Sequence, residues 1–262
     1  MEQKTLTLSL CQMEIVPGNW NVNQIHARSF LSAASKQGSN LILFPEMTLT
    51  GITDDVSSMS DSKEKTLISF QRLTSAYEIA IGFGWGKPIK NKLENHYTIV
   101  GPNGTILSDY VKIHPFTYGG EDKHFVSGND FSIFFYRGFR ICTFLCYDLR
   151  FPELYQAASK DCDLIITAAN WPASRKLHWK TLCQARAIEN QVYFAGCNMT
   201  GQSGDQYYSG DSALYAPDGK KLGSLSNSEG LITYTIINDV SSVRKDFPVK
   251  DDRKISYYKS IL

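Results

Sequence analysis

A cysteine at the end of an apolar run is the residue of this sequence best suited to covalent chemistry. Residues 139–145 (FRICTFL) predict a buried strand that stops at Cys146, and residues 153–160 predict a helix after Pro152. A thiol at such a strand-to-helix elbow lies near backbone N–H groups and a helix dipole, which favour negative charge. Cys146 could therefore be a nucleophile, and the competing interpretation is an ordinary buried thiol.

Polar side chains also follow three other expected strands. They are Glu46 after residues 41–44, Lys112 after residues 105–111, and Asn170 with Trp171 after residues 163–169. Since ligands gather where strand ends open into loops, we expect these side chains and Cys146 to share one pocket. Taken singly, Glu46 could cap a helix, Lys112 could be solvated, and Asn170 could simply form a turn.

Together these groups are suited to acyl transfer. A thiol with its usual pKa near 8.5 needs a base or a nearby cation to become a nucleophile. Glu46 could take the thiol proton during attack and return it to a leaving amine. The Lys112 ammonium and the backbone N–H of Tyr147 could hold the developing oxyanion, where one donor typically contributes about 3 kcal/mol.

The composition indicates a soluble, cytoplasmic protein that acts on a small molecule. The 262 residues carry 27 basic and 26 acidic side chains, and this balance speaks against nucleic acid or a membrane surface as the main partner. Six cysteines lie in apolar runs without a CxxC pair, which indicates reduced thiols. The first 15 residues predict a strand rather than a signal peptide, and no stretch approaches the ~20 apolar residues of a membrane span.

The remaining pattern predicts strands and helices in a single domain, residues 1–262. Further strands are expected over residues 5–13, 79–85, 95–101, 132–136 and 192–199, and further helices over residues 63–77 and 240–246. We expect the strands at 208–216, 220–225 and 231–237 to complete a second sheet, and a polar tail to follow. The loop at 114–129 is long enough to be functional or mobile.

Two helices carry cap and stripe predictions. Asn21, with Gln24 as its reciprocal partner, is expected to cap a helix. Its expected buried stripe is Ala27, Phe30, Leu31 and Ala34. Ser174 is expected to cap a helix over residues 175–190. Leu182, Ala185 and Ile188 are expected on one side of this helix.

Four sequence blocks resemble the nitrilase (carbon–nitrogen hydrolase) superfamily. They are FPEM at 44–47, DYVKIHPF at 109–116, FLCYDLRFPELY at 144–155 and the stretch 169–198. The resemblance covers nearly the whole chain and is strongest to the bacterial omega-amidase branch. Those enzymes hydrolyse the distal amide of 2-oxoglutaramate and 2-oxosuccinamate.

The resemblance implies a fold and a mechanism. The fold is a four-layer α-β-β-α sandwich without cofactor or metal, and the protein is expected to be a homodimer formed through the helix after Cys146 and the C-terminal tail. The mechanism is an acyl-enzyme path with Glu46 as base, Lys112 as oxyanion partner and Cys146 as nucleophile. A second glutamate, Glu121, is implied to position Lys112 and the substrate amide.

A carboxylate on the substrate would need a cationic partner. Arg150 is the first candidate, because a guanidinium matches a carboxylate bidentately, and the alternative is an ion pair with Asp148. Arg175 is the second candidate, and a surface position would explain it nearly as well. Trp171 could form a wall of the pocket or pack in the core.

Other functions are open at this stage. A papain-like hydrolase would need a histidine beside Cys146, and the five histidines show no recognisable arrangement. A metal site is disfavoured because cysteines and histidines lack paired ligand spacing. An N-carbamoyl, simple-amide or nitrile substrate is compatible with the same residues, as is a catalytically silent thiol-bearing binding module.

Overall fold

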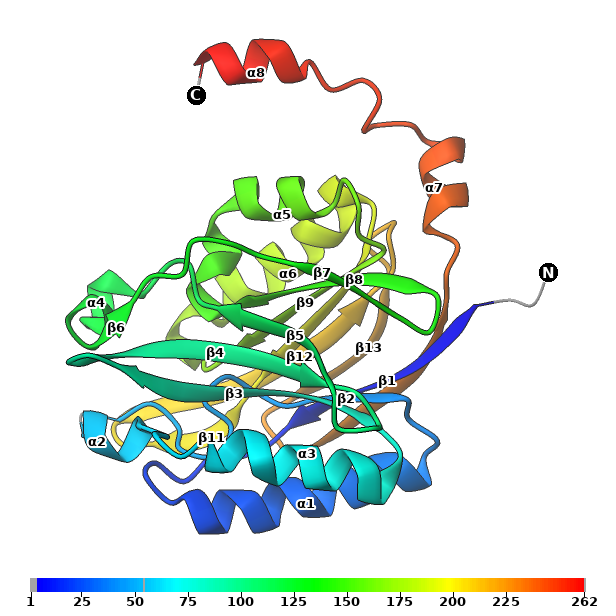
Figure 1. Ribbon diagram of the computed structural model, residues 1–262. Helices are drawn as coiled ribbons and strands as arrows, with labels where there is room; N and C mark the ends of the chain where they lie inside the picture. Colours follow the sequence, from blue (N-terminus) through cyan, green and yellow to red (C-terminus); the bar gives the residue numbers. More distant parts are fainter. Residues whose placement is uncertain (1–3, 54, 262) are drawn as a thin grey trace.

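Two mixed β-sheets, each of seven strands, face one another in the computed structural model, which describes residues 4–53 and 55–261 (Figure 1). The first sheet runs in the order β14-β1-β2-β3-β4-β5, with β6 paired to β4. Its strands are β1 (Thr5–Gln12), β2 (Leu41–Leu43), β3 (Ala80–Ile89), β4 (Lys92–Val100), β5 (Ile106–Val111), β6 (Phe125–Val126) and β14 (Gly230–Ile237).

The second sheet runs in the order β11-β12-β10-β9-β8-β7, with β13 paired to β12. Its strands are β7 (Ile133–Tyr136), β8 (Phe139–Leu145), β9 (Leu164–Ala169), β10 (Tyr193–Asn198), β11 (Thr200–Ser203), β12 (Gln206–Tyr215) and β13 (Lys221–Ser226). β8, β9 and β10 are parallel neighbours. Their carboxyl ends, including the end that carries Cys146, therefore open at the same edge.

Helices cover the outer face of each sheet. α1 (Trp20–Lys36) and α3 (Lys65–Tyr77) lie on the first sheet, and α5 (Pro152–Ala158) and α6 (Lys176–Asn190) lie on the second (Figure 1). The layers are thus α-β-β-α, which confirms the predicted fold class. The remaining helices are α2 (Val56–Met59), α4 (Glu121–His124), α7 (Val240–Asp246) and α8 (Ile255–Ile261), with 3-10 turns η1 (Thr117–Gly119), η2 (Cys146–Arg150) and η3 (Ala173–Arg175).

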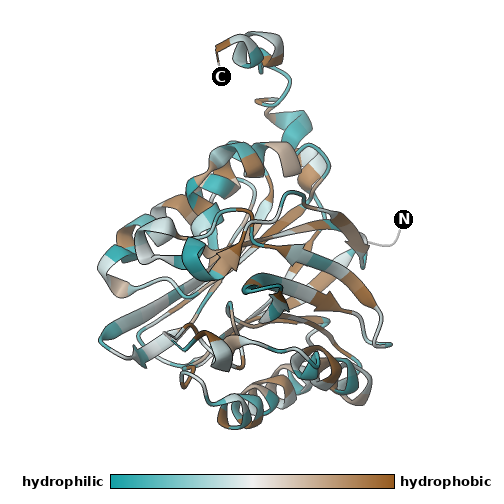
Figure 2. Cartoon of the chain, turned by 60° about the vertical axis from the view of Figure 1, so that its left-hand side comes forward, coloured by the Kyte–Doolittle hydropathy of each residue, from teal (hydrophilic) through white to brown (hydrophobic). Residues whose placement is uncertain are grey.

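The largest apolar cluster fills the space between the sheets. Leu8 of β1 and Tyr97 of β4 belong to it from one side, and Phe144 and Phe194 from the other, all without solvent exposure. A second cluster joins the first sheet to α1 and α3. Figure 2 shows brown, hydrophobic strands between helices of mixed colouring. Burying one such large side chain contributes about 1.5–3 kcal/mol, so the two sheets hold the loops at their edges in fixed positions.

The predicted caps of α1 and α6 are wrong. α1 begins at Trp20 and is capped by Asn19, whose Oδ1 accepts from the backbone N–H of Val22 at 3.2 Å. Asn21 therefore lies within the helix, and Gln24 bonds to Ser69 on α3 instead of completing a capping box. α6 begins at Lys176 without any side-chain cap.

Leu182, Ala185 and Ile188 do not mark the most buried side of α6, although Leu182 and Ala185 are half-buried. Its buried residues are Trp179, Cys183, Arg186, Ala187 and Asn190, whereas Ile188 is 50% exposed. Two of these buried side chains are polar, and Arg186 donates to the carbonyl of Leu149 at 2.7 Å. Apolar spacing in the sequence does not reveal this face, because two of its buried side chains are polar. On α1, Ala27, Leu31 and Ala34 are buried as predicted, and Phe30 is half-buried.

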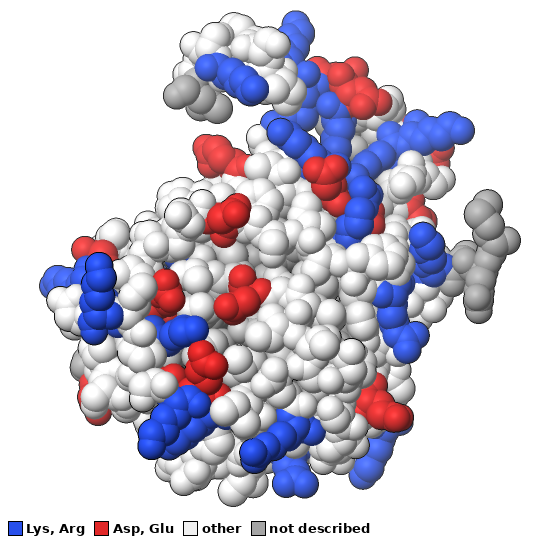
Figure 3. All heavy atoms as spheres, viewed as in Figure 1, with Lys and Arg blue, Asp and Glu red and all other residues white. Residues whose placement is uncertain are grey.

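The prediction that 231–237 joins the second sheet is wrong. β14 pairs antiparallel with β1 across eight residues of the first sheet, while β12 and β13 do belong to the second. The polar tail contains a helix, α8, which stands away from the layers in Figure 1. Figure 3, in the same view, shows charged side chains of both signs on the surface, and the basic ones are most dense beside α7 and the segment after it. No helix within residues 4–53 and 55–261 is both long and apolar enough to cross a bilayer.

Candidate active site

The carboxylate of Glu46 is completely buried at the end of β2. Its Oε1 accepts from Asn95 Nδ2 at 2.8 Å and from Lys112 Nζ at 3.0 Å, and its Oε2 accepts from the backbone N–H of Asn170 at 3.0 Å. These three donors come from both sheets. Glu46 is therefore not a helix cap, and its orientation is fixed by hydrogen bonds to both of its oxygens.

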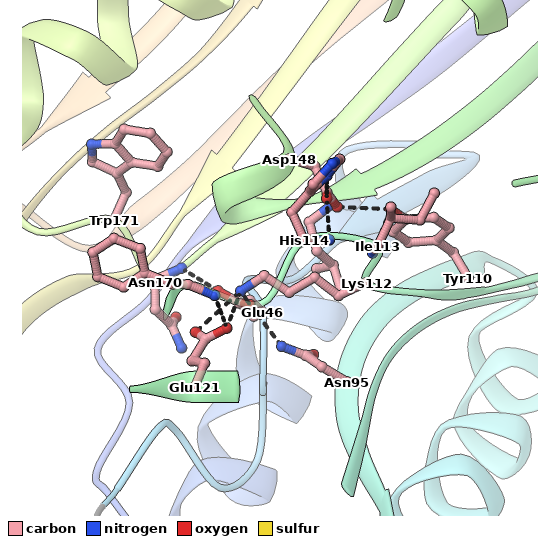
Figure 4. Close-up of polar contacts among 12 residues, drawn as sticks. Glu46, Asn95, Tyr110, Lys112, Ile113, His114, Glu121, Asp148, Asn170 and Trp171 are labelled. Carbon is pink, nitrogen blue, oxygen red and sulfur yellow. Dashed lines mark hydrogen bonds and ion pairs between the residues drawn. The ribbon is translucent and has the colours of Figure 1, made fainter. Parts of the chain in front are cut away.

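Lys112 directly follows β5 and is 1% exposed, so the solvated alternative is wrong. Its ammonium lies between two carboxylates, 3.0 Å from Glu46 Oε1 and 2.8 Å from Glu121 Oε2 (Figure 4). Burial alone would lower the pKa of Lys112, but the charges of Glu46 and Glu121 outweigh it and raise that pKa well above its usual value. Lys112 is thus a fixed cation.

Glu121 lies in the first turn of α4, within the long loop. Besides contacting Lys112 with both oxygens, its Oε2 accepts from the backbone N–H of Phe116 at 2.8 Å. The loop is held against the first sheet directly after α4, because β6 pairs with β4. The neighbouring Asp122 instead offers its backbone carbonyl to Lys92.

Cys146 is the first residue of η2, and its φ of 40° lies in the left-handed region. Such a conformation is strained for a residue other than glycine and lets the side chain leave the strand end sharply. Burial raises the pKa of the Cys146 thiol, and the Glu46 charge raises it further, while Lys112 opposes this. The resting group is accordingly a thiol, which needs a base during attack.

A cavity of about 880 Å³ opens over these residues. Cys146 and Glu121 line it, together with every residue predicted for substrate binding: Tyr147, Arg150, Asn170, Trp171 and Arg175. Glu46 and Lys112 lie buried behind this surface, in contact with Glu121 and Asn170. The volume suits a small organic molecule.

Both predicted arginines face aromatic rings in this cavity. The guanidinium of Arg150 lies 4.6 Å from the centre of the Trp171 ring, and that of Arg175 lies 5.3 Å from the centre of the Phe116 ring. Arg150 does not pair with Asp148, and neither arginine makes a salt bridge with a carboxylate in the described ranges. Burial lowers the pKa of Arg150, and the charge of Arg175 lowers it further, partly offset by Tyr147.

Two predicted residues combine structural and cavity-facing roles. Trp171 is 3% exposed, lines the cavity, and packs against Trp179 with ring centres 5.6 Å apart. Asn170 uses its backbone to bind Glu46, while its side-chain oxygen and nitrogen are buried without a hydrogen-bond partner among the described residues. An unpaired buried amide beside a cavity is suited to binding a polar ligand.

Sequence reasoning missed Asn95, Phe116 and Tyr208. Asn95 is internal to β4 and has no flanking motif, so only its contact with Glu46 reveals it. Phe116 and Tyr208 line the cavity. Burial raises the pKa of Tyr208 to about 12, with contributions from the charges of Cys146 and Glu46. A polar-aromatic residue near the tip of the β11–β12 hairpin is the only signal that the sequence offered.

The histidines do not provide an alternative base for Cys146. His114 Nδ1 lies 2.9 Å from Asp148 Oδ1, and no hydrogen bond joins a histidine to Cys146 within the part of the chain that is described. Groups of three or more histidine, cysteine, aspartate or glutamate side chains suited to a metal ion are not found among residues 4–53 and 55–261.

The chain is similar over most of its length to known amidases. Omega-amidase YafV of Yersinia enterocolitica is 35% identical over 212 residues, which cover 80% of this chain and 81% of that protein. The 2-oxoglutaramate amidase of Bacillus subtilis is 31% identical over 257 residues, 96% of this chain and 99% of that protein.

Solved structures share the whole fold. XC1258 from Xanthomonas campestris, described as a CN-hydrolase superfamily protein with an arsenic adduct in its active site, has a TM-score of 0.89 at 27% identity and covers 97% of this chain and 98% of its own. An amidase mutant from Nesterenkonia has a TM-score of 0.87 at 21% identity, with 100% and 99% covered, and supports the fold alone. The family model described as carbon-nitrogen hydrolase matches residues 7–245, and the chain belongs to this family.

Proposed function

We propose that this protein is an omega-amidase, which hydrolyses the distal amide of small 2-oxo dicarboxylic acid monoamides such as 2-oxoglutaramate and 2-oxosuccinamate. The products are the 2-oxo acid and ammonia. The relatives named omega-amidase and 2-oxoglutaramate amidase support this substrate class. The observation that carries the reaction is a buried ammonium held between two carboxylates, which interacts with a thiol that lines a cavity.

In the first half of the proposed reaction, Glu46 takes the thiol proton as the sulfur of Cys146 attacks the amide carbon. The carbonyl oxygen becomes an oxyanion, which the Lys112 ammonium and the backbone N–H of Tyr147 stabilise. Glu46 then gives its proton to the leaving nitrogen, the C–N bond breaks, and ammonia departs. A thioester on Cys146 remains.

The second half repeats these roles with water. Glu46 takes a proton from the water whose oxygen attacks the thioester carbon, and returns it to the sulfur as the C–S bond breaks. Glu121 is proposed to hold Lys112 and the substrate amide throughout, because its two oxygens contact the ammonium and it also lines the cavity. Asn170 offers its unpaired amide to the substrate.

The carboxylate of the substrate is proposed to bind Arg150, with Arg175 as second partner. Two guanidiniums face one cavity, and the charge of Arg175 contributes to lowering the pKa of Arg150. An anion bound between them would relieve this repulsion. Trp171 and Tyr147 hold the Arg150 guanidinium by stacking. This arrangement favours an anionic amide over a neutral one.

Ammonia release across a panel tests the proposal. The panel contains 2-oxoglutaramate, 2-oxosuccinamate, an N-carbamoyl amino acid, a simple neutral amide and a nitrile. Intact-protein mass spectrometry after mixing should show an acyl adduct that is absent from Cys146→Ala. Faster turnover of the N-carbamoyl or neutral compounds would contradict the omega-amidase assignment, and an adduct that persists in Cys146→Ala would contradict the nucleophile.

The assembly and location are further parts of the proposal. We propose that residues 1–262 form one domain of a cytoplasmic homodimer, which associates through α5 and the segment after α7. Exposed Phe247, Tyr257 and Ile261 in that segment support a partner surface. Light scattering should give twice the mass of the 29.4 kDa chain, and a truncation after α7 should lower it. A full-length monomer would contradict the dimer.

A further inference from the structure

Asp148 is a completely buried carboxylate that the mechanism above does not use. It lies in η2, two residues after Cys146. Its Oδ2 accepts from the backbone N–H of Leu145 at 3.1 Å and from the hydroxyl of Tyr110 at 2.7 Å. Its Oδ1 lies 2.9 Å from both the backbone nitrogen and Nδ1 of His114. Four donors around one carboxylate saturate it, so its position is fixed.

These donors come from different sheets. Leu145 is the last residue of β8 in the second sheet and directly precedes Cys146. Tyr110 belongs to β5 in the first sheet, and His114 lies just beyond that strand, so the two residues flank Lys112 in the chain. One carboxylate thus joins the strand end that carries the ammonium to the elbow that carries the thiol (Figure 4).

Further contacts stiffen this junction. The Tyr110 hydroxyl accepts from the backbone N–H of Ile113 at 3.1 Å. This hydrogen bond joins a residue that precedes Lys112 in the chain to the residue that follows it. The His114 ring stacks on Phe151 with ring centres 3.7 Å apart and an angle of 13° between the planes. The left-handed backbone of Cys146 needs such support, because strained residues persist only where their surroundings fix them.

We propose that Asp148 is a positioning residue, which holds the Lys112 ammonium at the correct place relative to the Cys146 thiol across the two sheets. The inference rests on the proposed function, because it takes the roles of Cys146 and Lys112 from it. A displacement of about 1 Å between reacting groups can reduce the rate about 100-fold, so removing this carboxylate should affect kcat more than KM.

The first test compares Asp148→Asn with Asp163→Asn. Asp163 is a matched control, since it is also buried and accepts from Arg140 and Asn238, but it lies at the start of β9, away from the cavity. We expect kcat to fall about 100-fold in Asp148→Asn with KM within about threefold, and kcat to stay within about threefold in Asp163→Asn at a similar loss of thermal stability. Equal kcat values in the two variants would overturn the proposal.

Tyr110→Phe decides the question if Asp148→Asn does not fold. Its control is Tyr193→Phe, because the Tyr193 hydroxyl also donates to a carboxylate, Asp239 Oδ1 at 2.9 Å, far from the site. We expect Tyr110→Phe to lower kcat about tenfold and Tyr193→Phe to leave it within about threefold. An unchanged kcat in Tyr110→Phe would overturn the proposal.

Alkylation of Cys146 by iodoacetamide separates this inference from the proposed function, because it needs no substrate. The charged groups that face the thiol are Glu46, Lys112, Glu121 and Arg150, and among the largest contributions to its pKa the Lys112 charge is the one that lowers it. Loosening Lys112 should therefore raise the pH midpoint of alkylation in the Asp148 and Tyr110 variants. An unchanged midpoint overturns the positioning role, whereas a wild-type protein that releases no ammonia from any amide overturns only the proposed function.

Discussion

Glu46 and Asn170 lie 124 residues apart in the chain and follow strands of different sheets, β2 and β9, yet the backbone N–H of Asn170 donates to Glu46 Oε2 at 3.0 Å. The same carboxylate accepts from Lys112 and Asn95. The proposed general base is therefore oriented from both sides of the sandwich. A substitution at Glu46 therefore changes both the charge of this side chain and its hydrogen bonds to Asn95, Lys112 and Asn170.

Replacing Glu46 with glutamine should lower kcat by about 100-fold to 10,000-fold and change KM by less than about threefold, because proton transfer occurs only in the transition state. Steady-state ammonia release from 2-oxoglutaramate measures both constants. Glu189→Gln on α6 is the control, since Glu189 accepts from Arg186 at 2.8 Å and does not line the cavity. A near-normal kcat in Glu46→Gln would show that another group is the base.

Replacing Arg150 with methionine should raise KM for 2-oxoglutaramate about tenfold or more and leave KM for a neutral amide nearly unchanged. Methionine keeps an apolar stem against Trp171, so the change removes mainly the charge. The exposed Arg28→Met controls for net charge. If both substrates lose affinity equally, Arg150 is a structural residue.

The pair of His96 and Asp109 should make stability depend on pH. Burial lowers the pKa of His96, but the Asp109 and Glu94 carboxylates, 3.0 and 3.2 Å away, outweigh it and raise that pKa above 6.5. A raised histidine pKa stabilises the fold fully below pH 6.5, and this contribution is lost as the pH rises through the raised value.

Urea unfolding of wild type and Asp109→Asn at about pH 6 and about pH 9 measures this effect. We expect the variant to be less stable by about 1 kcal/mol at the lower pH, a modest value because Asp109 is partly exposed, and the difference to shrink at the higher pH. A difference independent of pH would mean that His96 does not titrate with the pair.

Gly84 on β3 should not tolerate a side chain. A Cβ there would lie 2.4 Å from the backbone nitrogen of Met47 and 2.9 Å from the Cα of Glu46. We expect Gly84→Ala to cost about 1–3 kcal/mol of folding stability and to lower kcat as well, because the strain displaces the proposed base. Gly38→Ala, where nothing lies within 4 Å, should lose about 1 kcal/mol through its φ of 73° and keep full kcat. Thermal melts and ammonia release distinguish the two variants.

The sequence by itself predicted the fold class, most strands and the catalytic and substrate-binding residues that are proposed here. Apolar runs that end in Glu46, Cys146 and Asn170 mark strand ends, because a buried strand must stop where polar groups need partners. The sequence blocks around those residues also identified the family. Apolar runs and sequence blocks can be recognised without a structure, because they depend only on residues that are neighbours in the chain.

Only the tertiary structure decided which polar residues are buried and what they contact. The buried face of α6 includes Arg186 and Asn190, so apolar spacing alone does not identify that face. Asn95 carries no local signal, because its partner Glu46 lies on a distant segment, and the contacts of Asp148 with Tyr110 and His114 likewise join two sheets. A hydrogen bond between distant segments depends on how the sheets pack, and that packing is a property of the whole chain rather than of any stretch within it.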